Sequence, residues 1–571
     1  MANGLGITVD GKTLVQPGVV AKTNISAFNQ FNTSLQKRLA VIALAQGGVP
    51  QDLTLIRSVE QARAVLKNGA GLELVELAMN PSPAVPGAQE VLFYRLNAAI
   101  AASLDLGDLV VTASDINAGV YGNDIRIRRS AGANGGAIVE VENRASNTTI
   151  ISQELGPAFE IEYVGANLTP AVEVIDNAGN KTLRLSDDTN TINIPLGQGT
   201  IRDFDDLEEY LASNPDWQGT AVDGHRTFDV SLAPVGVLTL TANVTNIDIG
   251  ADAQAAFINT AEFVTAASAA NAAVGVGAGW VPLENGSEGP VATNADYLSA
   301  LDVLSNEDVQ VIVTDSTDPD VHASVNAHCS SLSHPVERRE RTQFCGIDTE
   351  ATAAAQVAAA LAAAKSLASE RTMVVGTPLK VRNIRTERLE VLDAGRVAAA
   401  IAGMYCGLNP EEPLTFKPIG AEDVAFKFSS TQIDDMVKGG VLSIQFDRES
   451  GVHIITEGIT SWLKDANAMR RTTTGVSIRD HLTRKLRRDT REFIGRVGDQ
   501  FTVEQIKQRI IRSLGQEVST PQNRGVLLGF DSVEVNFDGI NYVEVRFNAN
   551  PVGEVRNIFM EVFLLPRAIS V

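Results

Sequence analysis

The runs "VQVIVTD" (309–315), "TQFCGID" (342–348) and "RTMVVGT" (371–377) decide the fold of this chain. Each has the composition of a short buried strand, and the two segments between them, 319–332 and 350–369, have the composition of helices. Repeated strand–helix–strand units of this length imply a parallel sheet. We therefore expect an α/β core in this part of the chain.

The same alternation of strand and helix occurs earlier in the sequence. "LAVIALAQ" (39–46) and "EVLFYRLN" (90–97) are predicted strands. Between them, "DLTLIRSVEQARAVLKNG" predicts a short strand and then a helix that Ser58 caps and Asn68-Gly69 ends. After residue 391 a small-residue helix, a strand-rich stretch (438–458), two helices and three terminal strands follow.

The middle of the chain has a different composition. From about residue 115 to 280 it is rich in short strands, Asn, Asp and Gly. Residues 111–300 contain 25 acidic and 8 basic residues, a net charge of −17. We expect a multi-domain α/β (α+β) protein with a mostly parallel or mixed core sheet, an inserted β-rich domain and extended arms. The predicted parts are an N-terminal linking arm (1–25), a core in two pieces (26–110 and 291–545), an acidic surface domain (111–290) and a C-terminal strand or arm (546–571).

The charge of the whole chain argues against a nucleic-acid-binding protein. The net charge is −22 over 571 residues, whereas a nucleic-acid binder needs a basic surface. One stretch is an exception, because residues 470–512 hold twelve Lys or Arg and five Asp or Glu. It is either an ordinary solvated helical surface or a dock for an acidic partner. The candidate docking residues are Arg479, Arg484, Lys485, Arg487, Arg488 and Arg491.

The cysteines and the hydropathy of the chain indicate the cellular compartment in which we expect the protein. Its three cysteines, Cys329, Cys345 and Cys406, lack CxxC spacing and do not form a disulfide framework, so we expect a reducing compartment. The first residues have no signal-peptide pattern, and no run of about 18 apolar residues occurs. We expect a chain that is soluble, is made in the cytoplasm and does not insert into a membrane.

The loop "LENGSEGPVATNADYLSALDVL" (283–304) places glycines directly before a predicted helix, as phosphate-binding loops do. No lysine follows Gly289, however, and Glu284 and Glu288 would repel a phosphate. Thr293 followed by Asp296 indicates an ordinary helix start close to a capping box. The interpretation as a nucleotide site is therefore weak.

Other candidate chemical groups also have simpler explanations. Asp315, Asp318 and Asp320 follow a strand and could hold Mg²⁺, but acidic residues at that place also favour a helix N-terminus. A His/Cys cluster (His322, His328, Cys329, His334 and Cys345) lacks the convergent spacing of a zinc site. Cys406 has no histidine nearby in sequence, and a small buried residue is the simpler interpretation. We expect no catalytic residue, no metal and no cofactor, and hence a structural or assembly protein.

Several segments together resemble the tail sheath protein of contractile bacteriophage tails and related injection systems. They occur in the order of that family and extend over nearly the whole chain. They are "VQPGVVAKTNIS", "GGVPQDLTLIRSVEQARAVLKNG", "NAGVYGNDIRIR", "ENGSEGPVATNADYLSALDVL", "AAAIAGMYCGLNPEEPLTFKPI", "REFIGRVGDQFTVEQIKQRII" and "NIFMEVFLLP". The stretch "EGITSWLKDANAMRRTTT" and the Asn-Gly and Glu of "NGSEGP" depart from the commoner pattern of the family.

The resemblance implies a structural subunit that stacks in hexameric rings around an inner tail tube and contracts without a nucleotide. Its partners would be further copies of itself, the tube protein, and baseplate and tail terminator proteins, with no nucleic acid. The location would be the virion tail, after assembly in the host cytoplasm. Terminal arms would add strands to neighbouring subunits. The residues expected in these arms are Ile7, Val9, Leu14, Val15, Pro17, Val19, Ile558, Phe559, Val562, Phe563 and Leu564.

The resemblance also gives the glycine-rich loop a role, because it matches the joint where the chain returns from the inserted domain to the core. The expected junction residues are Gly119, Gly122, Asn123, Gly286 and Gly289. Two alternatives stay open, namely a bacteriocin or secretion-type contractile sheath and a metal-dependent α/β enzyme that uses Asp315, Asp318 and Asp320.

Overall fold

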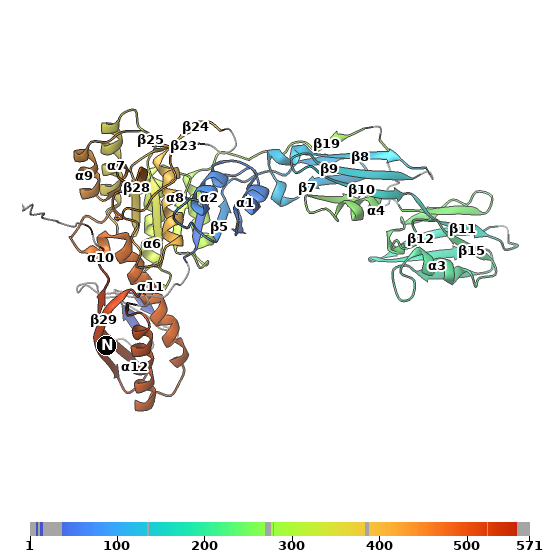
Figure 1. Cartoon of the computed structure of the whole chain (residues 1–571). Coiled ribbons are helices and arrows are strands. Elements are labelled where there is room, and N and C mark those ends of the chain that lie inside the picture. Colours follow the sequence, from blue (N-terminus) through green and yellow to red (C-terminus); the bar gives the residue numbers. More distant parts are fainter. Residues whose placement is uncertain are drawn as a thin grey trace, which may run out of the picture.

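The computed structural model has a central α/β core, an outer arm and a C-terminal subdomain, and the latter two leave the core in different directions (Figure 1). The structure describes residues 7–9, 12–14, 37–133, 136–167, 169–249, 251–268, 276–277, 279–382, 387–521, 524–554 and 556. The predicted multi-domain α/β (α+β) class is confirmed.

A seven-stranded sheet forms the centre of the core. Its strand order is β26-β22-β21-β20-β3-β5-β4, and every strand except β4 runs parallel to its neighbours. The strands are β3 (Leu39–Ala43), β4 (Leu53–Ile56), β5 (Val91–Arg95), β20 (Val311–Thr314), β21 (Thr342–Gly346), β22 (Thr372–Val375) and β26 (Val441–Leu442). The predicted parallel sheet is confirmed, and its central pair, β3 and β20, joins segments from either side of the outer arm.

Helices cover both faces of this sheet, because successive residues of each buried strand point to opposite sides. Leu39 and Val41 pack with α1 (Val59–Leu66), α2 (Ala70–Met79) and α8 (Ala394–Gly407). Ala40 and Ile42 pack with α5 (Asn294–Leu304) and α6 (Pro319–Leu332) on the other face. Farther along that layer lie α7 (Ala353–Leu367) and α9 (Ser430–Lys438).

Local capping explains where several of these helices begin. Ser58 accepts a hydrogen bond from the backbone N–H of Gln61, so the predicted cap of α1 is confirmed. Thr293 and Asp296 form the capping box of α5, as the sequence indicated. Helix α2 was not predicted, and it packs very closely on α8. A Cβ on Gly403 would lie 1.9 Å from the backbone oxygen of Ala78.

Small antiparallel sheets complete the core around α8 and α9. One has the order β24-β23-β25 and another pairs β27 with β28. Their strands are β23 (Leu379–Arg382), β24 (Leu389–Leu392), β25 (Asp423–Val424), β27 (Ile444–Asp447) and β28 (Val452–Ile455).

The outer arm is built mainly from antiparallel strands around one aliphatic and aromatic core (Figure 1). Its sheets have the orders β18-β7-β6, β10-β9-β8-β19, β15-β11-β17 and β14-β13-β12-β16. The nearer part contains β6 (Ser103–Asp105), β7 (Leu109–Ala113), η1 (Asp115–Asn117), η2 (Val120–Asp124), β8 (Ile125–Ala131), β9 (Ala137–Asn143), β10 (Thr148–Leu155), α4 (Ala251–Ile258), β18 (Val264–Ser268) and β19 (Val281–Pro282). The farther part contains β11 (Pro157–Tyr163), β12 (Ala171–Asn177), β13 (Asn180–Ser186), β14 (Thr191–Pro195), α3 (Phe204–Leu211), β15 (Trp217–Ala221), η3 (Val230–Leu232), β16 (Gly236–Leu238) and β17 (Val244–Asp248).

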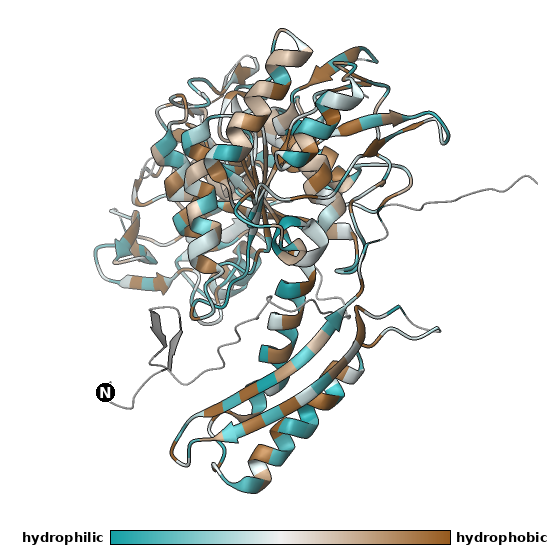
Figure 2. Ribbon diagram, turned by 90° about the vertical axis from the view of Figure 1, so that its left-hand side faces the viewer, coloured by the Kyte–Doolittle hydropathy of each residue, from teal (hydrophilic) through white to brown (hydrophobic). Residues whose placement is uncertain are grey.

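The C-terminal subdomain consists of helices and one long hairpin. Two strands, β29 (Leu527–Phe537) and β30 (Val543–Pro551), lie across α12 (Gln500–Gly515) (Figure 2). Helices α10 (Ala468–Arg471) and α11 (Thr473–Thr490) and the turn η4 (Arg491–Phe493) connect this unit to the core. A separate N-terminal hairpin pairs β1 (Ile7–Val9) with β2 (Lys12–Leu14), as the sequence predicted. The third predicted terminal strand, 557–566, lies outside the described residues.

Candidate functional sites at the two joints of the core

Arg95 is the centre of the joint between the core and the outer arm. It ends strand β5 and is completely buried. Its Nη1 donates to the backbone oxygens of Gly48 (2.6 Å) and Ala118 (2.8 Å), and its Nη2 donates to Oε2 of Glu288 (2.9 Å). Burial lowers the pKa of Arg95, and the charge of Glu288 opposes this shift. One side chain therefore connects the core sheet with both the outgoing and the returning segment of the chain.

Glu288 is the matching residue on the returning segment. In addition to Arg95, its carboxylate accepts hydrogen bonds from Nδ2 of Asn97 (2.7 Å) and from the backbone N–H of Val120 (3.0 Å). From the sequence, Glu288 was considered as a group that would repel phosphate and as a departure from the commoner family pattern, and it was not expected to form an ion pair. Arg95 was not considered at all, because its partners are far away along the chain.

The five expected junction residues lie at this joint. Asn123 donates to the backbone oxygen of Gly286 and accepts from its N–H, both at 2.9 Å. Gly119 and Gly289 have positive φ angles of 114° and 76°. A Cβ on Gly286 would lie 2.4 Å from the oxygen of Gly119, and one on Gly122 would lie 2.9 Å from Cβ of Ala102. The glycines are therefore needed for close backbone contact.

The two segments of chain that cross this joint run side by side. Ile100 pairs with Ser287 and Ser103 pairs with Glu284, both in antiparallel bridges. Backbone hydrogen bonds link these pairs in both directions. The outer arm therefore leaves the core and returns to it at one place.

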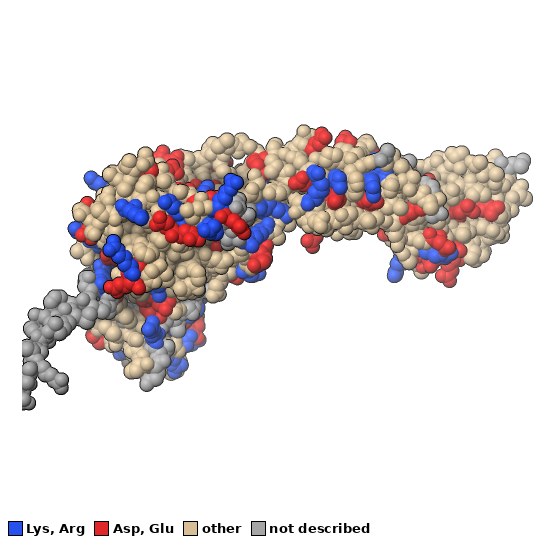
Figure 3. All heavy atoms as spheres, turned by 45° about the horizontal axis from the view of Figure 1, so that its top comes forward, with Lys and Arg blue, Asp and Glu red and all other residues tan. Residues whose placement is uncertain are grey.

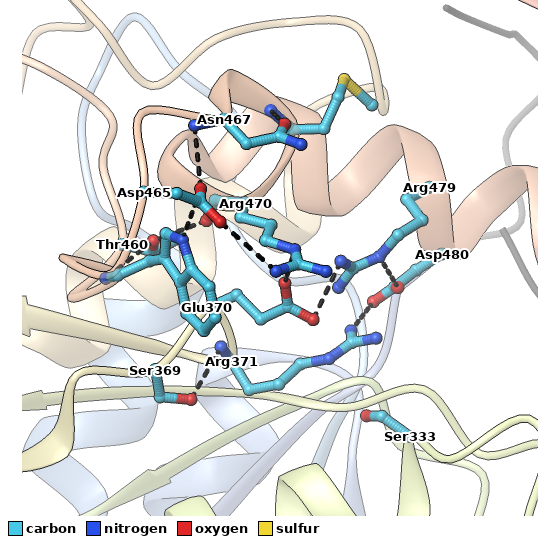
Figure 4. Close-up of polar contacts among 12 residues, drawn as sticks. Ser333, Ser369, Glu370, Arg371, Thr460, Asp465, Asn467, Arg470, Arg479 and Asp480 are labelled. Carbon is cyan, nitrogen blue, oxygen red and sulfur yellow. Dashed lines mark hydrogen bonds and ion pairs between the residues drawn. The ribbon is translucent and has the colours of Figure 1, made fainter. Parts of the chain in front are cut away.

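The second joint lies where α11 crosses the amino-terminal ends of the parallel strands (Figure 1). Arg371, directly before β22, is paired with Asp480 of α11. Nη1 of Arg479 lies 2.9 Å from Oε1 of Glu370, and Arg487 is paired with Glu340, which precedes β21. The close-up in Figure 4 shows the side chains of Glu370, Arg371, Arg479 and Asp480 converging between the core and α11. We call these six residues the ion-pair seam.

The burial of the ion-pair seam corrects the prediction that all six candidate docking residues form a basic surface. Arg479 and Lys485 are buried, and Lys485 is paired at 2.5 Å with the fully buried Glu517. Together with Arg487, these cations bind carboxylates of the same chain and do not form a free surface. The physical reason is that α11 is enclosed over its first three turns, whereas both interpretations of the sequence, a solvated surface and a dock for an acidic partner, required an exposed helix.

Of the other three candidate arginines, Arg488 and Arg491 are exposed and Arg484 is half-buried. Arg484, Arg488 and Arg491 are spaced four and three residues apart, so they follow one side of the helix and its continuation. Arg484 lines a polar cavity of about 270 Å³ together with residues 306–310 and 338–340. The described part of the chain shows no carboxylate within pairing distance of Arg491. These arginines keep the docking role only as a hypothesis.

Lys37 anchors the place where the N-terminal segment joins the core. Its buried ammonium group donates to the backbone oxygens of Tyr405 (2.8 Å) and Leu408 (3.4 Å) at the end of α8. Its Nζ also lies 4.0 Å from the centre of the Tyr405 ring. Burial lowers the pKa of Lys37 to about 8.

The acidic residues after β20 have structural partners. Asp315 accepts hydrogen bonds from the hydroxyl of Tyr297 (2.6 Å) and from the N–H of Leu44 (2.8 Å), and burial raises its pKa. Asp318 caps α6 by accepting from the N–H of Asp320 (2.8 Å). The capping explanation is therefore confirmed for Asp318.

The His/Cys candidates do not converge on a common point. His322 binds the backbone oxygen of Ser316 (2.8 Å), and His328 binds Nη1 of Arg341 (2.7 Å). Burial and the Arg341 charge lower the pKa of His328 to about 4, and burial raises the pKa of the Cys329 thiol to about 12. Within the described ranges, no three His, Cys, Asp or Glu residues are placed to hold a metal ion.

The surface view agrees with the uneven distribution of charge along the chain. In Figure 3, acidic and basic side chains mix over the core, and acidic ones prevail on the far end of the outer arm. The described helices include none that is long and apolar enough to cross a membrane.

Comparison with solved structures identifies the class of fold. The chain superposes on a sheath tail protein from Desulfitobacterium hafniense with a TM-score of 0.55 at 16% identity, covering 96% of this chain and 97% of that one. A sheath tail protein from Listeria innocua gives a TM-score of 0.56 at 14% identity, with 92% and 94% coverage. The core, outer arm and C-terminal subdomain together therefore have the fold of a sheath tail protein.

The sequence comparisons give the same similarity as the solved structures. Residues 291–461 match the phage tail sheath protein central domain. The chain is 22% identical over 564 residues to the tail sheath protein of Bacillus phage SP01, which covers 94% of this chain and 93% of that protein. It is 25% identical over 472 residues to the putative tail sheath protein of Enterococcus phage phiEF24C, covering 76% and 77%. The predicted resemblance is confirmed, because the matching family model, the curated relatives and the superposed structures are all tail sheath proteins.

Proposed function

We propose that this chain polymerises as stacked hexameric rings around an inner tail tube. In this proposal the sheath forms in a metastable extended state, and its contraction drives the tube through the host envelope during genome delivery. The similarity to a tail sheath protein over 94% of the chain supports this proposal. The partners would be further copies, the tube protein, and baseplate and tail terminator proteins, in a virion tail assembled in the host cytoplasm.

The observation that carries the proposal is the open hairpin β29–β30. It is a two-stranded sheet, and apart from one bridge between Val518 and Leu527 no other described segment pairs with either edge. One face packs on α12, whereas the other exposes polar side chains such as Glu534 and Asn536. A two-stranded sheet is only marginally stable alone, and free edges accept further strands. The hairpin is therefore suited to receive strands from neighbouring subunits.

The terminal segments are the proposed source of those strands. Ile7, Val9 and Leu14 belong to the hairpin β1–β2, which pairs with no other described strand. Val15, Pro17, Val19, Ile558, Phe559, Val562, Phe563 and Leu564 lie outside the described residues. In the proposal, the arms 1–25 and 546–571 link subunits by strand addition, which supplies backbone hydrogen bonds as well as side-chain contacts.

The proposed division into domains keeps the boundaries expected from the sequence, except at the base of the outer arm. The core would comprise residues 26–110 and 291–545, and the acidic domain 111–290 would face outward. Strand β7 crosses the boundary at 110/111, and β30 crosses the one at 545/546. We therefore propose that the outer arm begins nearer to Ile100, where the outgoing and returning segments first pair.

Deletion of residues 1–22 tests the linking role. The purified full chain should form striated tubes or rings in negative-stain electron microscopy, whereas the truncated chain should remain folded and soluble without polymerising. A control that lacks only residues 1–5 keeps both strands of β1–β2 and should still form tubes. Tubes of normal length from the 1–22 deletion would rule out linking by this arm. Discrete particles from the full chain would rule out the sheath proposal.

A further inference from the structure

The nearer and farther parts of the outer arm are joined at a narrow place. In the described chain, no strand of the nearer part pairs with a strand of the farther part. The chain passes outward at Gly156, between β10 and β11, and returns after Ile249 (Figure 1). The backbone N–H of Ile249 donates to the oxygen of Gly156 at 2.8 Å, and Nζ of Lys181 lies 3.6 Å from Asp252 of α4 across the joint. Two parts with separate sheets, connected by two adjacent passages of chain, have the geometry of a hinge.

His225 of the farther part is placed across this hinge. It lies in the turn after β15 and is only 4% exposed. Its Nδ1 lies 3.0 Å from the backbone oxygen of Pro157, and its Nε2 is in hydrogen-bond contact with the backbone oxygen of Glu154. These two oxygens stand on either side of Gly156, one in each part of the arm. The side chain therefore connects both parts at the point where the chain passes between them.

The number of donors determines the charge of this ring. A backbone oxygen only accepts hydrogen bonds, so both ring nitrogens of His225 must donate. A neutral imidazole has one donor nitrogen, whereas the imidazolium cation has two. Histidine is the side chain that ordinarily changes charge between about pH 5 and 8. The observed contacts therefore belong to the cation, and loss of one proton would set a nitrogen lone pair against a carbonyl oxygen.

The charges that the farther part carries around this turn favour the cation. Residues 157–248 contain fifteen acidic and four basic residues. The cation next to the ring in sequence, Arg226, is paired with Asp205 and Glu208 of α3 and lies 3.5 Å from Asp223. Three carboxylates thus surround one guanidinium group, and the balance of charge beside the ring is negative.

The strands that meet at the hinge add only acidic groups. Glu154 of β10 directs its carboxylate to the backbone N–H groups of Ala133 and Gly136, from which it accepts hydrogen bonds. Asp248 ends β17 and lies beside the start of β11 in the strand register. A negative field stabilises a positive ring, so both carboxylates favour the doubly protonated form of His225.

We propose that His225 is a proton-dependent latch of a hinge within the outer arm. While the ring carries both protons, it binds the backbone oxygens of Glu154 and Pro157 and keeps the farther part closed on the nearer one. When one proton leaves, one of these hydrogen bonds is lost and the farther part swings about Gly156. The latch goes beyond the proposed function, because it works within a single chain and needs no partner.

Hydrogen exchange of the full-length chain, followed by mass spectrometry, tests the latch. Protection is expressed relative to the unstructured peptide at the same pH, which removes the intrinsic effect of pH on exchange. The N–H of Ile249 reports opening of the hinge, and the N–H of Val174, in a strand paired on both sides, reports unfolding of the farther part. The variants are His225→Gln, which has no charge, and His225→Lys, which keeps a positive charge and three donors. His453→Gln, at a buried histidine in the core, is the control.

In wild type, the protection of Ile249 should fall about tenfold between about pH 5.5 and 8.5, the effect of losing one such hydrogen bond, while that of Val174 stays constant. His225→Lys should keep the high protection at both pH values, and His225→Gln should show the low protection at both. His453→Gln should respond to pH like wild type. These results would support the latch.

Two other results would overturn it. An equal fall in the protection of Val174 would show that the farther part unfolds instead of swinging. Protection of Ile249 that is independent of pH in wild type, or that depends on pH equally in His225→Gln, would show that the ring is not the latch. The wild-type comparison decides even if a variant does not fold. None of these outcomes bears on polymerisation, so the proposed function is tested separately.

Discussion

Arg95 Nη2 lies 2.9 Å from Glu288 Oε2, and this contact joins residues that are 193 positions apart in the sequence. Arg95 is fully buried, whereas the Glu288 side chain keeps 30% exposure. The pair therefore sits at the boundary between the interior of the core and the base of the outer arm. Its geometry fixes how the arm leaves the core.

Glu288→Gln should loosen this joint. The substitution preserves size but leaves the buried guanidinium of Arg95 without its carboxylate. We expect the free energy of unfolding to fall by about 1–3 kcal/mol, nearer the lower value because water reaches Glu288. Urea unfolding measures the loss, and limited proteolysis around residues 117–123 should become faster. Glu284→Gln, at an exposed position nearby, should change stability by less than about 0.5 kcal/mol. Equal losses of stability in Glu288→Gln and Glu284→Gln would contradict the role of the Arg95–Glu288 pair.

Gly289→Ala should destabilise the joint through the backbone. Gly289 has a φ angle of 76°, and a Cβ there would lie 2.1 Å from the backbone oxygen of Ala98. Gly539 has a similar φ angle of 83°, but no atom lies within 4 Å of its Cβ position. Gly539→Ala should therefore cost only about 1 kcal/mol from backbone strain, and Gly289→Ala should cost clearly more. Similar shifts in thermal midpoint for the two variants would show that the close approach to Ala98 is unimportant.

Asp480→Asn should uncouple the C-terminal subdomain from the core. It leaves Arg371, which is buried, without its ion-pair partner, and such losses cost about 3–5 kcal/mol. Arg488→Gln alters an exposed arginine on the same helix and should be nearly neutral. The measurement is denaturant-induced unfolding, followed separately in the core and in the C-terminal subdomain. An unfolding curve like that of wild type for Asp480→Asn would contradict the role of the seam.

Asp480 also predicts that the stability of the fold falls at acidic pH. Burial alone would raise the pKa of Asp480, but the charges of Arg371 and Arg479 outweigh it and hold the pKa below the usual value. A depressed folded-state pKa stabilises the fold above the unfolded pKa of about 4, and this contribution is lost as the pH falls through the folded-state value. Asp480→Asn should therefore lose less stability than wild type on acidification.

Lys37 predicts a pH dependence of the same sign at alkaline pH. Its folded-state pKa of about 8 lies below the unfolded value of 10.5, so the unfolded chain binds more protons between these limits. The contribution of Lys37 to the free energy of unfolding should therefore rise with pH in this window, by up to about 1.4 kcal/mol per pH unit. Lys37→Met should flatten that slope in urea titrations from about pH 8 to 10. Lys464→Met, at an exposed position, should keep the slope of wild type, and an unchanged slope in Lys37→Met would contradict the assignment.

Local patterns in the sequence predicted most of the core. The strands around 309–315, 342–348 and 371–377 were found because buried parallel strands and their connecting helices leave a clear alternation in composition. Caps at Ser58 and Thr293 were also predictable, since a capping side chain binds a backbone N–H only about three residues away. The acidic, turn-rich middle of the chain likewise indicated a separate β-rich part.

The contacts that build the two joints were not predictable from such patterns. Arg95 is one polar residue at the end of a strand, and nothing near it in the sequence reveals Glu288 as its partner. The charges of α11 were misinterpreted for the same reason, because Glu340 and Glu370 lie more than 100 residues before the arginines that they bind. Composition shows that a helix is basic, but only the fold shows that its cations are already paired.

The chain leaves the core at Ile100 and returns at Ser287, directly beside it, and this arrangement is suited to the insertion of a domain. The core sheet closes by pairing β3 with β20, and neither strand depends on contacts inside the outer arm. The outer arm is therefore an inserted domain that is attached to the core through two neighbouring ends of the chain. Other domains whose termini lie equally close together could be grafted there, while the residues that form the joint are retained.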